Sequence, residues 1–167
     1  MNRFVRLTER ISDVAAWISA LILGAICLLI LTEILLWNTL EKTTLVADEY
    51  SAYGLAAITF LGAGYCLKER GHIRLTLVLA LLPARAARIL TWLSTVLATV
   101  FMAYLWWYLG RMVLSSYRYG STSGTLTATP LWIPQAFMLA GMSCFLLQFL
   151  GMAVKTYLAI GTGEEVV

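Results

Sequence analysis

The residues that could carry out chemistry are few in this sequence. It holds one histidine, His72, and three cysteines, Cys27, Cys66 and Cys144, with no Cys-x-x-Cys pair. A zinc site needs three or four nitrogen, sulfur or oxygen ligands, and a haem held between helices commonly needs two axial histidines. The sequence therefore predicts no metal, no cofactor and no disulfide framework. The cysteines are expected to pack as small apolar residues.

Two titratable side chains each leave two interpretations open. Glu33 is the only acid inside a long apolar stretch, where a carboxylate is by default a functional candidate, here for proton coupling. It lies only four residues before Trp37, near the end of that stretch. From there it could instead reach water or pair with Arg or Lys from another helix. His72 either titrates near neutral pH or is a polar loop residue bonded to the local backbone.

Four long apolar stretches must position these residues. Of 167 residues, 60% are hydrophobic and 13% charged, whereas a soluble domain is about 45–50% apolar and about 25% charged. About 20 apolar residues form a helix that crosses the hydrocarbon core. The sequence therefore predicts a single all-α integral membrane domain over residues 1–167, which excludes a soluble enzyme and a nucleic-acid-binding protein. The predicted spans are 14–37, 50–67, 89–110 and 131–154.

The basic residues predict the orientation of the four spans. Nine of the twelve Lys and Arg lie before span one, between spans two and three, or after span four. The other three are Lys42, Arg111 and Arg118. Cytoplasmic loops carry the excess of Lys and Arg. Both termini are therefore predicted to lie in the cytoplasm, with the chain in a bacterial inner membrane.

Two further segments are predicted to form short interfacial helices. The first, at the N-terminus, has an apolar face opposite a basic face, as expected for a helix lying on anionic lipid. These faces are formed by Phe4, Leu7 and Ile11 and by Arg3, Arg6 and Arg10. The second, 75–82, is apolar but too short to span the membrane, and Pro83 ends it.

Polar and small residues suggest helix-end and helix–helix contacts. Asp48 and Glu49 open the second span, where acids favour the free N–H groups of a helix start. They could equally contact a periplasmic partner. Spans two and four are rich in glycine and other small residues, which allow close helix packing in lipid, and Gln135 and Gln148 are candidate interhelical donors. This packing could be internal or with another subunit.

Several of these residues occur together in motifs. They are Asp48-Glu49-Tyr50, Phe60-Leu61-Gly62-Ala63, Gly71-His72-Ile73-Arg74 and Leu81-Leu82-Pro83. With the length, the four spans and the orientation, these motifs resemble the small membrane subunit of tripartite ATP-independent periplasmic (TRAP) transporters, the DctQ-like family.

The resemblance implies a non-catalytic accessory subunit. In this family a large polytopic membrane subunit carries substrate with sodium, and a soluble periplasmic binding protein delivers it, commonly as an organic acid anion. The small subunit would brace the large one. The motif positions carried over are Asp48, Glu49, Gly62, Gly71, His72, Ile73, Arg74 and Pro83. Of these, Arg74 is expected to contact anionic lipid head groups, and Asp48 and Glu49 to face the binding protein.

Two other transport interpretations remain open. The chain could be an autonomous homodimeric transporter with Glu33 as its proton site, in which case Glu33→Gln would abolish transport by this chain alone. It could also be the small subunit of a tripartite tricarboxylate transporter. A carrier, however, needs polar or discontinuous helices near the middle of the membrane. The four spans offer only small hydroxyls and two glutamines there, which favours a subunit that binds another membrane protein.

The interpretation of Arg74 makes a direct prediction. If its guanidinium holds anionic head groups or a partner at the cytoplasmic face, Arg74→Glu impairs complex assembly or uptake without blocking membrane insertion. Assembly is measured by co-purification, uptake with radiolabelled substrate, and insertion by the amount of protein in isolated membranes. Normal assembly and uptake in this variant would contradict the role.

Overall fold

The computed structural model describes residues 3–69 and 83–162 of the chain. Four motif positions of the sequence analysis, Gly71, His72, Ile73 and Arg74, lie outside the described residues, as does the predicted interfacial segment 75–82.

Long helices make up nearly all of the described chain. Each is long and apolar enough to cross a membrane. They are α1 (Arg3–Leu40), α2 (Ala47–Lys68), α4 (Ala84–Arg118) and α5 (Trp132–Thr162). The prediction of an all-helical membrane protein with four spans is therefore confirmed.

The N-terminal residues belong to α1 rather than to a short helix of their own. Within 3–40, α1 runs without a break, so the predicted N-terminal interfacial helix is not confirmed as a separate element. No proline or glycine interrupts the chain before Gly24. The first turns also pack on α5: the Thr8 hydroxyl lies 2.8 Å from where a Cβ on Gly151 would be. Ser12 donates a hydrogen bond to Gln148, 3.3 Å between Oγ and Oε1.

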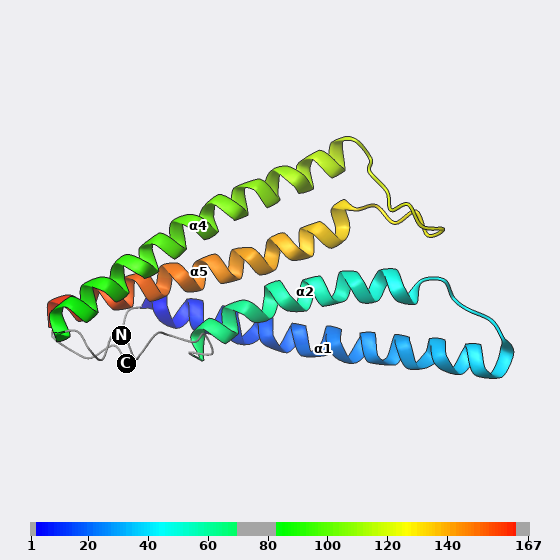
Figure 1. Cartoon of the computed structure of the whole chain (residues 1–167), viewed down its shortest axis with the longest axis horizontal. Coiled ribbons are helices and arrows are strands. Elements are labelled where there is room, and N and C mark those ends of the chain that lie inside the picture. Colours follow the sequence, from blue (N-terminus) through cyan, green and yellow to red (C-terminus); the bar gives the residue numbers. More distant parts are fainter. Residues whose placement is uncertain (1–2, 70–82, 163–167) are drawn as a thin grey trace.

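The four helices form an open array, not a closed bundle. Packing runs in the order α1, α2, α5, α4, and α1 also contacts α5. Helix α4 packs mainly on α5, so α1 and α4 form the two edges of the array (Figure 1). The loops 41–46 and 119–131 lie at one end, called here the outer end. The start of α1, the end of α2, the start of α4 and the end of α5 lie at the other, the inner end.

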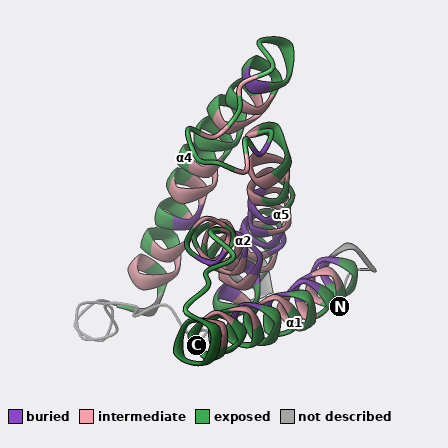
Figure 2. Ribbon diagram, turned by 90° about the vertical axis from the view of Figure 1, so that its right-hand side faces the viewer, coloured by how far each residue is buried: buried purple, intermediate pink, exposed green. Residues whose placement is uncertain are grey.

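A small apolar core lies between α2, α5 and α4. The Phe145 and Phe149 rings meet edge to face with centroids 4.9 Å apart. The buried cluster is Leu67, Met142, Phe145 and Phe149. In Figure 2, buried residues lie on α5, on α2 and on the first half of α1, while most of the remainder of α1 and most of α4 are exposed or intermediate. Because lipid is as apolar as the exposed side chains of these helices, exposure of apolar residues is expected in a membrane helix.

Glycines bring α2 and α5 into backbone contact. A Cβ on Gly141 would lie 2.7 Å from the Leu61 nitrogen and 2.7 Å from the Phe60 carbonyl carbon. One on Gly64 would lie 3.6 Å from the Phe145 Cα. Small residues of spans two and four thus pack against each other within the chain.

Gly141→Ala should therefore destabilise the protein, since the backbone of α2 would have to move to admit a methyl group. Overpacking of this kind costs roughly 1–3 kcal/mol. The measurement is the melting temperature in mild detergent, with unfolding monitored by tryptophan fluorescence. Gly24→Ala is the matched control, because no atom lies within 4 Å of that Cβ position. Equal melting temperatures for the two variants would contradict this account of the α2–α5 contact.

Candidate functional site

The structure does not gather the described motif residues into one site. Asp48 and Glu49 lie in the first turn of α2, after Val46, which makes no side-chain capping bond. Gly62 is thirteen residues further along α2, about 20 Å away at 1.5 Å per residue. Pro83 directly precedes α4 at the inner end, and its carbonyl accepts the hydrogen bond that begins that helix. These positions therefore follow the length of the array instead of lining one cavity.

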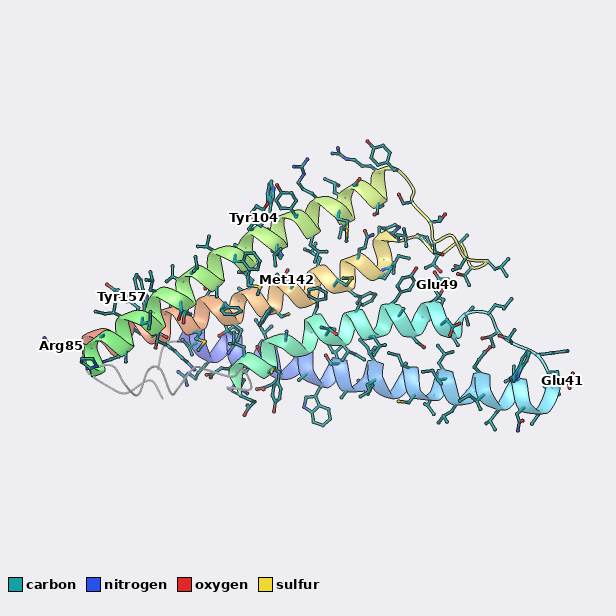
Figure 3. The ribbon with its side chains drawn as sticks, in the orientation of Figure 1. Glu41, Glu49, Arg85, Tyr104, Met142 and Tyr157 are labelled. Atoms are coloured by element: carbon teal, nitrogen blue, oxygen red, sulfur yellow. The ribbon has the colours of Figure 1, made fainter. Side chains whose placement is uncertain are left out.

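The Glu49 carboxylate joins α2 to the loop between α4 and α5. The Tyr53 hydroxyl donates to Oε1 at 2.8 Å. The hydroxyls of Thr125 and Thr127 both donate to Oε2. Figure 3 shows Glu49 at the start of α2 beside this loop. Asp48, one residue earlier, is exposed. Of the two predicted outer acids, Glu49 is thus engaged within the chain and Asp48 faces outward.

A row of hydroxyls gives the loop 119–131 a fixed shape. The Ser123 and Thr125 hydroxyl oxygens lie 2.7 Å apart, and those of Thr125 and Thr127 lie 2.8 Å apart. The Thr129 N–H donates to the Ser123 hydroxyl at 3.0 Å, and the Ser123 N–H donates to the Thr129 carbonyl at 2.9 Å. Gly120 turns the chain out of α4 at φ +59°, a backbone conformation that favours glycine. The Ser, Thr and Gly content of this loop does not by itself predict these contacts.

Glu33 has a similar environment in the other outer loop. The Thr44 N–H lies 3.1 Å from each of its carboxylate oxygens. The hydroxyls of Thr43 and Thr44 also donate to the carboxylate. Glu33 therefore ties the loop 41–46 back onto α1. This arrangement favours structural pairing over proton coupling, and the partners are threonines of the adjacent loop rather than Arg or Lys of another helix.

Two ion pairs tie the inner end of the array. Lys68 of α2 pairs with Asp13 of α1, and Lys155 of α5 pairs with Glu9 of α1. Between them Gln148 accepts a hydrogen bond from α1, although the sequence suggested it as a donor. Partly exposed pairs such as these each contribute only about 0–1 kcal/mol. Sequence analysis missed them because the partners are 55 and 146 residues apart. The four-residue spacing of Glu9 and Asp13 places both acids on one helical face, and this spacing could have indicated that they pair with bases of neighbouring helices.

Several acidic side chains of the described residues contact other parts of the same chain. Over residues 3–69 and 83–162, no group of three or more His, Cys, Asp and Glu is placed to hold a metal ion. The carboxylates with clear partners, Glu9, Asp13, Glu33 and Glu49, all bond to other parts of this chain. The charged groups thus fasten helix ends and loops.

A chain of four apolar helices fastened by polar contacts at both ends is a multi-pass membrane protein. Residues 26–158 match the family described as "Tripartite ATP-independent periplasmic transporters, DctQ component". The chain therefore belongs to this family and is the small membrane component of a TRAP transporter, which confirms the resemblance seen in its motifs. Such a component belongs to a tripartite complex with a large membrane subunit and a binding protein. No curated protein and no solved structure matches the sequence.

The Glu49 contacts lead to a prediction about the loop 119–131. In Glu49→Ala the loop loses the carboxylate that binds it to α2, and with it the charge-assisted hydrogen bonds from Thr125 and Thr127. The loop amides should then exchange with deuterium about tenfold faster or more. Hydrogen–deuterium exchange with mass spectrometry on protein in nanodiscs measures this rate. Asp48→Ala is the control and should leave the rate unchanged; indistinguishable rates in the two variants would show that Glu49 does not hold the loop.

Proposed function

We propose that this small subunit braces the large membrane subunit of its TRAP transporter during sodium-coupled uptake of an organic acid. The observation that carries the proposal is the open array. Four helices in the order α1, α2, α5, α4 leave long apolar faces on both edges, which suits a chain that lies alongside another membrane protein. The described helices also run without a break, whereas a carrier commonly binds its solute at discontinuous helices.

Buried polar groups support the same conclusion. Most of the buried hydroxyls bond to their own helix, as when Ser19 donates to the Ala15 carbonyl at 2.9 Å and Thr156 to the Met152 carbonyl at 2.9 Å. A hydrophilic anion crossing the membrane needs polar side chains that converge near mid-depth. The charged side chains that converge from different helices, Glu9, Asp13, Lys68 and Lys155, do so at the inner end. Within the spans, the contact from Trp106 of α4 to the Ser143 hydroxyl of α5, 2.8 Å between Nε1 and Oγ, is uncharged. Transport itself is accordingly assigned to the large subunit.

The orientation and the lipid contacts belong to the same proposal. Both termini lie in the cytoplasm of a bacterial cell, with the chain in the inner membrane. The basic residues Arg85 and Arg88 at the inner start of α4 support this orientation under the positive-inside rule. Arg74 and its neighbours contact anionic head groups on that side, and Asp48 faces the binding protein.

The structure gives little support to Glu33 as the proton site of an autonomous homodimeric transporter. The Glu33 carboxylate is held by Thr43 and Thr44 next to the outer loop. A coupling carboxylate must exchange protons with both sides of the membrane in turn. Glu33 is instead held at the outer end of the array by its bonds to the loop 41–46. The family match to the DctQ component likewise supports the TRAP assignment over a tricarboxylate system.

Co-purification tests the proposed function. With an affinity tag after Val167 and extraction in mild detergent from the native host, a much larger polytopic protein should elute in a fixed ratio to this chain and be identified by mass spectrometry. Recovery of a homo-oligomer alone in several detergents would overturn the proposal and favour the autonomous homodimeric transporter.

A further inference from the structure

The two hairpins of the array carry net charges of opposite sign at the outer end. The α1–α2 hairpin carries four acids and one lysine there: Glu33, Glu41, Asp48, Glu49 and Lys42. The α4–α5 hairpin carries two bases, Arg111 and Arg118, and the sequence from 70 to 163 contains no Asp or Glu. The outer end is therefore acidic on one side and basic on the other.

The two arginines share one exposed face of α4. They are seven residues apart, two helical turns or about 10 Å, and both are exposed. Among the residues that the structure describes, neither takes part in an ion pair. Tyr119, directly after Arg118, is 83% exposed. We call Arg111, Arg118 and Tyr119 the outer arginine patch.

Depth in the membrane separates the two arginines. The apolar part of α4 is predicted to end at residue 110, so Arg111 lies at the edge of the hydrocarbon core. The head-group layer adds only about 5–8 Å on each side. Arg118 is about 10 Å further along α4, so at this predicted depth its guanidinium reaches beyond the head-group layer. Arg111 is within reach of lipid phosphates, but Arg118 and Tyr119 are placed to meet a soluble partner.

The loop that follows α4 does not neutralise the patch. Residues 119–131 carry no charged side chain. The loop hydroxyls of Thr125 and Thr127 are bonded to Glu49 at the start of α2. In Figure 1 the outer end of α4 rises away from α2, at the edge of the array. The basic end of α4 is therefore left open to solvent.

We propose that the outer arginine patch is where the periplasmic binding protein of this transporter docks, through an acidic area on its own surface. The proposal rests on the proposed function and names the contact on this subunit. Complementary charge steers association and selects the partner. Arginine and tyrosine are also enriched among the residues that dominate interface energies. The acidic α1–α2 side, with Asp48, would repel that acidic area and face a different part of the binding protein, so the charge division sets the direction in which the binding protein sits.

The test uses the complex of both membrane subunits in nanodiscs of neutral lipid, with the cognate binding protein as the probe in biolayer interferometry. Arg118→Glu should slow association about tenfold or more, and Arg118→Gln should have a smaller effect. Lys42→Glu is the matched control: it is an exposed outer base on the opposite hairpin and should change the rate less than twofold. Raising the salt concentration should reduce the difference between Arg118→Glu and the unmodified complex.

Several outcomes would overturn the docking proposal. One is unchanged association in an assembled Arg118→Glu complex, and another is an equal loss in Lys42→Glu, which would indicate a general field effect. A loss that appears only in nanodiscs of anionic lipid would assign the patch to head groups. If no large subunit co-purifies with the unmodified chain, the proposed function itself fails. Co-purification is therefore carried out before any binding measurement, so that the two failures are distinguished.

Discussion

The structure depends on one constraint, that every backbone N–H and C=O group inside the hydrocarbon must be bonded within the protein. Long uninterrupted helices meet this constraint, and side-chain hydroxyls within them follow the same rule. Thr32, Thr59 and Thr91 each donate to the carbonyl four residues earlier, at 2.7–2.8 Å. The ion pairs and loop contacts described above therefore lie at the helix ends. Within the spans, Trp106 of α4 donates to the Ser143 hydroxyl of α5 at 2.8 Å, and this contact between helices is uncharged.

The same solvent explains why the array is open. Between helices in lipid, burial of apolar surface gives little net gain, so association relies on close packing and polar contacts. Close packing occurs where Gly141 meets the backbone of α2. Polar contacts occur at the two ends, through Lys155 on the inner side and Glu49 on the outer side. Helix α4 packs mainly on α5, and it forms the less supported edge.

Hydropathy predicted the number, type and approximate limits of the spans, because the length of an apolar stretch is a local property of the sequence. The continuity of α1 was not predicted, since charged residues at 3–13 suggested a separate helix, and contacts of Thr8 and Ser12 with α5 decide the matter. The partners of Glu49 were also missed. Thr125 and Thr127 are more than seventy residues away, and no periodicity in the sequence encodes a contact between a helix start and a distant loop.

The parallel course of α2 and α5 has a consequence for biosynthesis. Both run from the outer to the inner end, and their contact joins Leu61 to Gly141, so the central core cannot form until the last helix has left the ribosome. Until then the α1–α2 hairpin must persist in the bilayer on its own contacts, which include Ile26 against Gly54, the Lys68–Asp13 ion pair and the bonds between Glu33 and its own loop. Glu33 can thereby act before the protein is complete, because it holds the loop 41–46 against α1 within the half that is made first.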